Sequence, residues 1–482
     1  MDESLTPRSE DAVSRLGDRA TDGPEVVDTL DQAPDLWGRD YRSRAECDRD
    51  RILYCSAFRR LAYVTQVTAP EAGHAFHNRL SHSLKVAQVG RRNAERLLAI
   101  AQTEEEITGN ARTTVLSIDP NAVEASCLAH DLGHPPFGHI AETVLSKCAE
   151  DYIQHDGVFE GNAQSFRIVT RLAQRAGGSG LDLTRQTLDG ILKYPWRWWR
   201  EDPLNSGKRE RKWGYYKDDE DTYTFARQYS PGEDDDKTLP ERSIEALIME
   251  WADDLTYAVH DVDDFFRAGL IPLHRLSRSA DDEVKRLKEL LEDARNADRK
   301  AWPGFEIDEL LETIAAVAGR YAPTGAYHQT RDHRRRMRRF DSDLITRYLA
   351  AFRVEDAPES AKVHVVVDEA IVREVEALKM LVRVYVIRRP GLAIVQHGQQ
   401  RIIKDLFDAY FYASEEGRAG DRRIFPPGTK RTLDEGPNDP AYRARTVIDF
   451  IAGLTEETAL ELHRRLFGEG TKITLDATAH MA

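Results

Sequence analysis

Apolar positions recur at helical spacing through most of the chain. They follow a period of about 3.6 residues in, for example, the segments 52–62 and 80–97. Residues 123–133 (VEASCLAHDLG) are apolar around most of their surface, which predicts a central buried helix that begins just after Pro120. Strand signals are sparse, and the best one, VHVVVD at residues 363–368, continues into a helix-like segment. The pattern therefore predicts an all-α, mainly helical protein.

The composition changes along the chain and suggests three regions. Residues 1–38 contain Pro, Gly, Asp and Ser with little periodicity, which predicts a flexible N-terminal tail. A core region follows at 39–275, and within it residues 200–240 are aromatic but highly charged and contain many turn-forming residues. We expect these to form an exposed insertion between two helices. Residues 276–482 are expected to form a helical C-terminal region, with a charged amphipathic helix at 281–297.

Length and composition exclude some classes of protein. With 482 residues, the chain exceeds one ordinary core of roughly 100–200 residues, so two or three lobes are expected. Hydrophobic residues make up 41% of the chain and seven residues are Trp, which excludes a disordered protein. The formal net charge of −15 argues against a surface that binds nucleic acid or anionic lipid throughout, although it does not exclude a local basic site.

The sequence also bears on the compartment. No stretch approaches the roughly 18 apolar residues of a membrane span, and the N-terminus is polar and acidic, unlike a signal peptide. We therefore expect a cytoplasmic protein with no membrane partner. Cys47, Cys55, Cys127 and Cys148 form no CxxC pair, so we expect reduced thiols rather than disulfides or a thiolate zinc site.

Three short segments combine histidine with carboxylates. They are HNRLSHSLKVAQVGRR (77–92), CLAHDLGHPPFGHIAE (127–142) and IMEWADDLTYAVHDVDD (248–264). The third carries Asp253, Tyr257 and Asp261 at i, i+4 and i+8, and therefore on one face of a helix. Neutral imidazoles and carboxylates suit a borderline or hard divalent ion, and a small number of protein ligands leaves room for water and substrate.

Each segment also has a purely structural interpretation. A lone histidine such as His82 on an amphipathic helix is more often a capped or core side chain than a metal ligand. The acidic run at 253–264 fits a solvated helix face. The conjunction favours a metal site, because His82, the pair His130–Asp131 and then Asp253 follow in this order on helix-like segments with apolar neighbours.

The second segment also suggests a proton donor. His139 is followed at i+3 by Glu142, so on a helix the carboxylate orients the imidazole, as in a general-acid or phosphate-binding dyad. His134 precedes Pro135 and Pro136 on an irregular turn, from which it would reach a phosphate. In the alternative interpretation, the prolines only shape a tight connection and His134 is exposed.

The order H…HD…D resembles the HD-domain metal-dependent phosphohydrolases. The strings AHDLGHPPFGHIAE, FEGNAQSFRI, LTRQTLDGILKYPW and ADDLTYAVHDVDD are similar to the deoxyguanosinetriphosphate triphosphohydrolase branch of that superfamily, and the likeness covers roughly residues 45–270. The resemblance implies an all-α HD-domain catalytic core at 39–275, a bound divalent metal ion and a homo-oligomer, commonly a dimer of trimers in this family.

The same resemblance implies three groups of site residues. The implied metal ligands are His82, His130, Asp131 and Asp253. Asp253 is chosen over Asp254 because the family has a Tyr and an Asp four and eight residues after this ligand. The implied catalytic group is the pair His139 and Glu142 together with a phosphate-contacting His134. The implied substrate contacts are Gln66 beside the sugar and base, Tyr257 and Asp261 at the deoxyribose, and Arg79, Lys193 and Tyr194 at the triphosphate.

The expected function is that of a metal-dependent dNTP triphosphohydrolase that favours dGTP and releases the deoxynucleoside and inorganic triphosphate. We expect Mg or Mn as the ion, although these ligands also accept Fe, Co, Ni or Zn. Two other functions stay open: an HD-type nucleotidase or phosphomonoesterase, and a regulator that responds to a nucleotide or single-stranded DNA. The cluster Arg334–Arg339 suits either a phosphate-bearing effector or the acidic surface of a neighbouring subunit.

Overall fold

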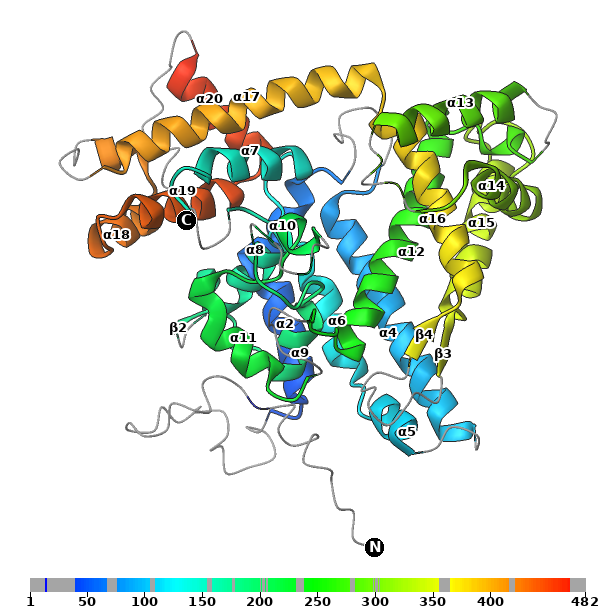
Figure 1. The fold of residues 1–482 in the computed structure, drawn as a ribbon, viewed down its shortest axis with the longest axis horizontal. Helices are drawn as coiled ribbons and strands as arrows, with labels where there is room; N and C mark the ends of the chain where they lie inside the picture. The colour runs from blue at the N-terminus through cyan, green and yellow to red at the C-terminus, as the bar shows by residue number, and fades with distance from the viewer. Residues whose placement is uncertain are drawn as a thin grey trace, which may run out of the picture. The chain divides into compact units, whose positions relative to one another are not determined.

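Helices dominate the computed structural model of the chain, and the described strands form only two short hairpins (Figure 1). The all-α fold expected from the sequence is confirmed. The N-terminal tail expected at 1–38 lies outside the described residues, apart from Ser14. The structure describes residues 14, 40–66, 76–104, 109–153, 158–175, 178–199, 201, 204, 207–230, 238–277, 282–297, 299, 302, 304–354, 365–415 and 421–468.

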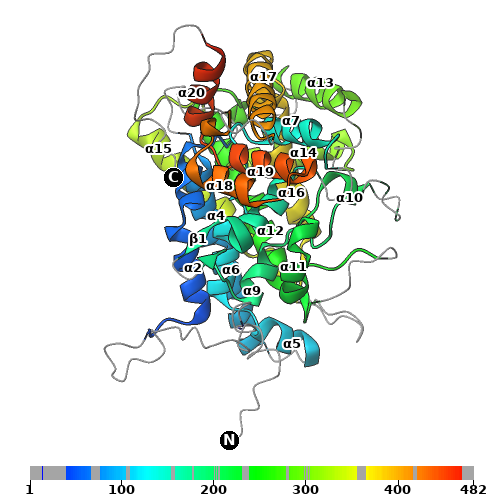
Figure 2. The same cartoon turned by 90° about the vertical axis from the view of Figure 1, so that its left-hand side faces the viewer.

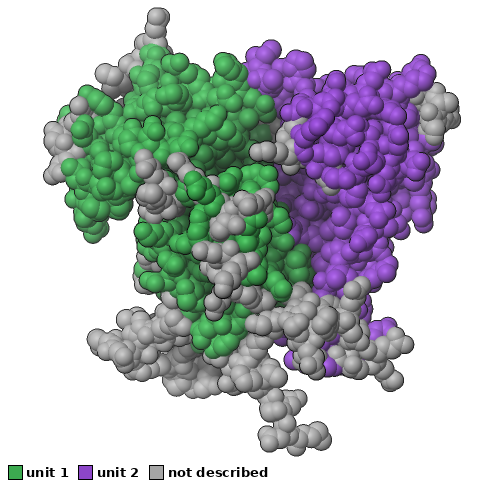
Figure 3. All heavy atoms as spheres, viewed as in Figure 1, with its two compact units in different colours: residues 1–65, 121–249, 396–482 green, residues 66–120, 250–395 purple. Residues whose placement is uncertain are grey.

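The chain divides into two compact units, which Figure 3 shows in green and purple. Unit 1 consists of residues 1–65, 121–249 and 396–482, and unit 2 of residues 66–120 and 250–395. The units therefore alternate along the chain, unlike the consecutive regions expected from the sequence. Two long helices run from one unit into the other, namely α12 (Ile244–Arg267) and α17 (Pro390–Ala413).

Unit 1 contains one short hairpin and the helices of its three chain segments, which include the C-terminal helices. Its β1 (Gln174–Arg175) pairs antiparallel with β2 (Gly178–Ser179), with Gln174 opposite Ser179. Its helices are α2 (Arg44–Tyr54), α3 (Ser56–Arg60), η2 (Leu61–Tyr63), α6 (Pro120–Ala129), α7 (His139–Ala149), α8 (Gly161–Arg167), η4 (Ile168–Leu172), α9 (Arg185–Ile191), α10 (Lys208–Arg211), η5 (Lys217–Asp219), α11 (Glu220–Arg227), η9 (Asp421–Ile424), α18 (Pro427–Glu435), α19 (Pro440–Ala452) and α20 (Glu456–Phe467).

Unit 2 contains long amphipathic helices and one hairpin. Its β3 (Phe352–Val354) pairs antiparallel with β4 (Val365–Val367), with Phe352 opposite Val367, so the strand expected at 363–368 is confirmed over these three residues. Its helices are α4 (Arg79–Thr103), α5 (Gly109–Leu116), η6 (Leu273–Arg275), α13 (Asp282–Ala297), α14 (Ile307–Tyr321), α15 (Arg331–Leu349), α16 (Glu369–Val382) and η8 (Arg383–Ile387). None of the described helices combines the length and the apolar character that a membrane crossing requires.

One hydrophobic core of unit 1 joins segments that are far apart in the sequence. The helices α7, α17, α18, α19 and α20 lie together in both views (Figures 1 and 2). Leu145 of α7 packs in the same buried cluster as Phe407 of α17 and Ile448 of α19. Burial of these apolar side chains is favourable, so the cluster stabilises the position of α7. The first turn of α7 carries His139 and Glu142.

The segment expected to be an exposed insertion is packed where it is described. Trp213, Tyr215 and Tyr216 are buried, and the rings of Tyr215 and Tyr223 stack at 3.9 Å between centroids. Trp213 and Tyr216 share a cluster with Trp196. The expectation of an exposed segment is therefore wrong for residues 207–230, because its aromatic side chains form a small core beneath the charged ones.

Candidate active site

The pair His130–Asp131 follows directly after the buried helix α6, and both side chains are buried. His130 Nδ1 donates a hydrogen bond to the carbonyl oxygen of Cys127, 2.7 Å away. This contact leaves the lone pair on Nε2, which lies 3.4 Å from Asp131 Oδ1. The loop after the pair passes close to α8, because a Cβ atom on Gly133 would lie 2.2 Å from the carbonyl oxygen of Gly161.

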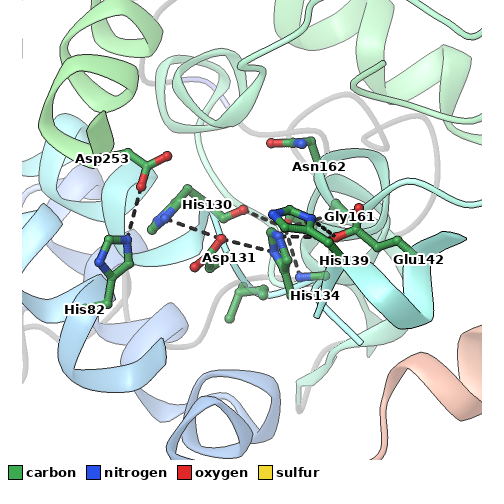
Figure 4. Close-up of polar contacts among 12 residues, drawn as sticks. His82, His130, Asp131, His134, His139, Glu142, Gly161, Asn162 and Asp253 are labelled. Carbon is green, nitrogen blue, oxygen red and sulfur yellow. Dashed lines mark hydrogen bonds and ion pairs between the residues drawn. The ribbon is translucent and has the colours of Figure 1, made fainter. Parts of the chain in front are cut away.

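A continuous chain of contacts leads from Asp131 to the start of α7 (Figure 4). His134 Nδ1 lies 3.0 Å from Asp131 Oδ1, and His134 Nε2 lies 3.3 Å from Glu142 Oε1. Glu142 in turn contacts His139 Nδ1 at 3.1 Å, as the i, i+3 spacing predicted. His134 is buried, so the interpretation that it is exposed is wrong, whereas the side chain of His139 is 71% exposed.

The electrostatics of Glu142 differ from those of an isolated buried carboxyl group. Burial alone would raise its pKa, but the charges of His139, Lys212 and His134 bring the pKa well below the usual value. Glu142 is therefore a carboxylate at neutral pH. The Glu142 carboxylate accepts a hydrogen bond from His139 Nδ1 and so orients the exposed imidazole, as a proton donor requires.

Lys212 belongs to this cluster, although the sequence did not single it out. Its Nζ lies 2.7 Å from Glu160 Oε1 and 3.5 Å from Glu142 Oε2. Glu160 caps α8, because it accepts hydrogen bonds from the backbone N–H groups of Asn162 and Ala163. The available signal was the Lys-Trp dipeptide in the middle of the charged segment 200–240, where an aromatic residue marks a local core.

Lys193 and Tyr194 follow α9 in the same unit. The carbonyl oxygen of Lys193 accepts a hydrogen bond from Arg242, and the Tyr194 ring packs 5.6 Å from Trp196. The charges of Glu160 and Glu142 raise the pKa of Lys212 against the effect of burial, and Tyr194 contributes in the same direction. Tyr194 therefore lies near the cluster that ends at Lys212.

In unit 2, α4 and α12 carry the other predicted residues. α4 begins at Arg79 after an Asn78 cap, and His82 on its first turn is buried with Nε2 3.1 Å from Asp253 Oδ1 (Figure 4). Asp253, Tyr257 and Asp261 lie on the single helix α12, as their spacing predicted. The structure thus brings His82 and Asp253 together within this unit.

Among the sugar-binding candidates of unit 2, Asp261 is buried, and Tyr257 and Gln66 are partly exposed. Burial raises the pKa of Tyr257, and the charges of Asp261 and Asp253 raise it further. Burial and the charge of Asp264 raise the pKa of Asp261 well above its usual value, although Arg79 lowers it. Within the described part of the chain, Asp261 Oδ2 and Gln66 Oε1 are buried atoms without a hydrogen-bond partner. Such groups are ready to bind a polar ligand.

The spacing of the donor atoms fits a divalent ion. Two ligand atoms about 2.0–2.2 Å from one ion lie roughly 3.0–3.5 Å apart. His130 Nε2 and Asp131 Oδ1 in unit 1 are separated by 3.4 Å, and His82 Nε2 and Asp253 Oδ1 in unit 2 by 3.1 Å. The two predicted pairs are therefore compatible with metal ligation, although a hydrogen-bonded pair such as His463–Asp405, at 3.0 Å, has a similar spacing.

Comparisons with known proteins agree with this chemistry. Residues 79–258 match the HD domain, and residues 365–465 match the phosphohydrolase-associated domain. The chain is 34% identical to the deoxyguanosinetriphosphate triphosphohydrolase-like protein of Streptomyces coelicolor over 90% of its own length and 95% of that protein. It is 33% identical to the protein of that name from Bordetella pertussis, over 89% of its length and 91% of the relative. The chain belongs to this family.

Membership in the deoxyguanosinetriphosphate triphosphohydrolase-like family supports a metal-dependent phosphohydrolase. HD domains bind divalent metals, which agrees with the two imidazole–carboxylate pairs. The matched HD domain contains both pairs and the residues from His134 to Glu142. Its last residue is Ala258, so Asp261 lies just beyond the match on the same helix.

Proposed function

We propose that the protein hydrolyses deoxynucleoside triphosphates, with dGTP favoured, at the α-phosphate and releases the deoxynucleoside and inorganic triphosphate. The observation that carries this proposal is the contact chain from Asp131 through His134 and Glu142 to His139. These contacts connect Asp131, a proposed metal ligand, with the exposed imidazole of His139. This arrangement suits a reaction that needs a bound ion, phosphate contacts and a proton for a leaving oxygen.

The metal ligands in this proposal are those that the family resemblance implies: His82, His130, Asp131 and Asp253. Support comes from the HD domain match, which contains all four, and from the ligand spacing of each pair. A divalent ion bound there would withdraw charge from the α-phosphate and lower the pKa of a water molecule. Mg or Mn is proposed, and Fe, Co, Ni or Zn would fit the same donors.

Proton transfer is assigned to His139. Its imidazole is exposed enough to reach a substrate, and its Nδ1 donates to the Glu142 carboxylate. The other ring nitrogen therefore faces outward and donates a proton to the 5′-oxygen of the departing deoxynucleoside. Glu142 keeps its negative charge and stabilises the imidazolium before the transfer.

Phosphate binding is assigned to basic and polar side chains. His134 contacts a carboxylate with each ring nitrogen, and a doubly protonated ring satisfies both contacts. Arg79, Lys193 and Tyr194 are proposed contacts of the triphosphate, and we add Lys212. The Nζ atom of Lys212 lies 2.7 Å from Glu160 Oε1 and 3.5 Å from Glu142 Oε2, so its positive charge is next to the proposed proton-transfer pair.

The sugar and base are assigned to Tyr257, Asp261 and Gln66. The raised pKa of Asp261 favours its protonated form, which can donate as well as accept a hydrogen bond with the 3′-hydroxyl group. The family resemblance adds that this pocket leaves no room for a 2′-hydroxyl group.

The decisive test is product analysis. The purified protein is incubated with each of the four dNTPs, with GTP and with a deoxynucleoside monophosphate, in Mg²⁺ or Mn²⁺. We expect inorganic triphosphate and the deoxynucleoside in equal amounts, with dGTP fastest and GTP not hydrolysed. Release of pyrophosphate or orthophosphate as the first product would overturn the proposal, and turnover of the monophosphate alone would indicate a nucleotidase.

Assembly and regulation are proposed on resemblance alone. We propose a homo-oligomer, a hexamer by analogy, and a nucleotide or single-stranded DNA effector. The Arg334–Arg339 cluster lies on α15, where Met337 is buried and the five arginines are exposed. Sedimentation measures the assembly, and a mobility shift with single-stranded DNA tests the effector.

A further inference from the structure

The turn between α19 and α20 is linked by hydrogen bonds to the loop that precedes α7. Arg60 of α3 is buried, and its guanidinium group donates to the carbonyl oxygen of Leu132 at 2.6 Å and to that of His134 at 2.9 Å. The same group donates to the carbonyl oxygen of Leu454 in the turn, 3.2 Å away. One side chain therefore joins the start of this loop to the turn.

Glu456, the first residue of α20, contacts the end of the same loop. Its Oε1 atom accepts hydrogen bonds from the backbone N–H group of Phe137 at 3.2 Å and from that of Thr65 at 2.7 Å. Its Oε2 atom accepts one from the Thr65 hydroxyl group at 2.7 Å. A single carboxylate in unit 1 thus connects two segments of that unit that are far apart in the sequence.

The backbone at Phe137 has an unfavourable conformation. Its φ angle is 68°, in the left-handed region that residues with a side chain rarely adopt, and Gly138 follows with a φ angle of 59°. Such a conformation persists only where the surrounding structure fixes it. The hydrogen bond to Glu456 is one such contact, and it acts two residues before His139, where α7 begins.

We propose that Glu456 is a positioning residue for the hydrolysis reaction, a role that rests on the function proposed above. Through the N–H group of Phe137 it fixes the turn that leads to His139, the proposed proton donor. Through Thr65 it fixes the backbone directly before Gln66, the proposed contact of the sugar and base. Glu456 belongs to the matched phosphohydrolase-associated domain, so this domain helps to arrange the candidate active site.

Two substitutions of Glu456 separate its contacts from its charge. Glu456→Ala removes all three hydrogen bonds. In Glu456→Gln the amide oxygen can accept from both N–H groups and the amide NH₂ group can donate to the Thr65 hydroxyl oxygen, so the contacts are kept and only the charge is lost. Glu457→Ala is the control, because Glu457 is exposed and carries the same charge in the same turn of α20.

Steady-state kinetics of the full-length variants test the proposed role. We expect Glu456→Ala to lower kcat by about tenfold and to raise KM several-fold, because both His139 and Gln66 lose a fixed backbone. The ratio of kcat/KM for dGTP and dATP should change as well. Glu456→Gln should stay within about threefold of the wild type, and Glu457→Ala should match the wild type.

Three kinetic results would overturn the proposal. A purely structural role of Glu456 would only reduce the amount of active protein, so kcat would fall while KM and the dGTP to dATP ratio stayed constant. Equal losses in Glu456→Ala and Glu457→Ala would show that the charge of the first turn matters and the contacts do not. Equal losses in Glu456→Ala and Glu456→Gln would lead to the same conclusion.

Amide hydrogen exchange tests the positioning without any substrate. Peptides that contain Thr65 and Phe137 are followed by mass spectrometry in the full chain. We expect several-fold faster exchange of both peptides in Glu456→Ala, and wild-type rates in Glu456→Gln and Glu457→Ala. Unchanged exchange in Glu456→Ala would overturn the proposal. By contrast, a wild-type protein that releases no inorganic triphosphate from dNTPs would overturn the proposed function, and the exchange rates would be unaffected by that result.

Discussion

The pKa values of two buried carboxyl groups, one in each unit, are shifted in opposite directions. In unit 1, burial would raise the pKa of Glu142, but His139, Lys212 and His134 bring it well below the usual value. In unit 2, burial and the neighbouring Asp264 raise the pKa of Asp261 well above the usual value, and Arg79 does not compensate. Neighbouring cations therefore outweigh the effect of burial on the pKa of Glu142, whereas a neighbouring carboxylate adds to the effect of burial on the pKa of Asp261.

This difference separates two chemical tasks. A charged carboxylate surrounded by cations suits proton transfer and phosphate binding, since both involve groups that change or carry charge. A neutral carboxyl group can donate as well as accept a hydrogen bond, which suits an uncharged hydroxyl group of a sugar. The proposed function needs both tasks.

The largest expected effect comes from the proposed metal-ligand pair of unit 1, His130 and Asp131. We expect His130→Ala to lose bound metal and at least about 10³-fold in kcat, since it removes an imidazole whose tautomer is fixed by Cys127. Metal content by mass spectrometry and steady-state rates measure this. His463→Ala is the control, because His463 also contacts a carboxylate in unit 1, Asp405 at 3.0 Å, outside the candidate site. Equal losses in the two variants would contradict the assignment.

The next effect concerns the charge of Glu142. We expect Glu142→Gln to keep the metal but to lower kcat by about 10²–10⁴-fold, because His139 loses the carboxylate that stabilises its protonated form. Steady-state rates and metal content measure this. A rate loss accompanied by loss of helical circular dichroism would show that Glu142 only supports the structure of α7.

A smaller effect is expected in unit 2. We expect Asp261→Asn to lower kcat/KM for a dNTP by roughly tenfold or more and to reduce discrimination against the ribonucleotide, with the metal retained. The substitution should also change how the stability of the folded protein depends on pH. The folded protein keeps a proton on Asp261 that the unfolded chain releases above about pH 4, so wild-type stability falls as the pH rises, and the Asn variant lacks this fall. Thermal unfolding of both proteins from pH 4 to pH 8 measures it, and parallel curves would contradict the raised pKa.

The sequence predicted the local parts of the candidate site. The i, i+4, i+8 spacing of Asp253, Tyr257 and Asp261 and the i, i+3 spacing of His139 and Glu142 follow from helical periodicity, which needs no long-range information. The grouping of the metal ligands came from family resemblance, and it stays a proposal.

The contacts between residues far apart in the sequence were not predicted. Lys212 and Glu160 are 52 residues apart, and Lys212 lies in a segment whose charges suggested exposure. Burial of Trp213 and Tyr216 overrode that signal, because aromatic side chains in a charged segment still leave water when a partner surface is present. The alternation of the two units along the chain also arises from contacts between distant segments, which hydrophobic periodicity does not encode.

The smallest expected effect concerns stability and a carboxyl group of unit 2 outside the proposed site residues. Asp341 of α15 lies in unit 2 near Asp263, Arg267 and Lys85, and burial together with Asp263 raises its pKa to about 7. Between about pH 4 and pH 7 the folded protein holds a proton that the unfolded chain has released, so the free energy of unfolding decreases as the pH rises through this window. Above pH 7 both states are ionised and the penalty is complete.

We therefore expect Asp341→Asn to raise Tm by a few degrees at pH 8, at roughly 2–4 °C per kcal/mol in a chain of this size, and to have little effect at pH 4. Asp343→Asn on the same helix is the control, since Asp343 pairs with Arg339 at an exposed position. A rise in Tm that does not depend on pH, or the same rise in both variants, would contradict the raised pKa of Asp341. The contrast with Glu142 would then reflect the local contacts of α7 alone.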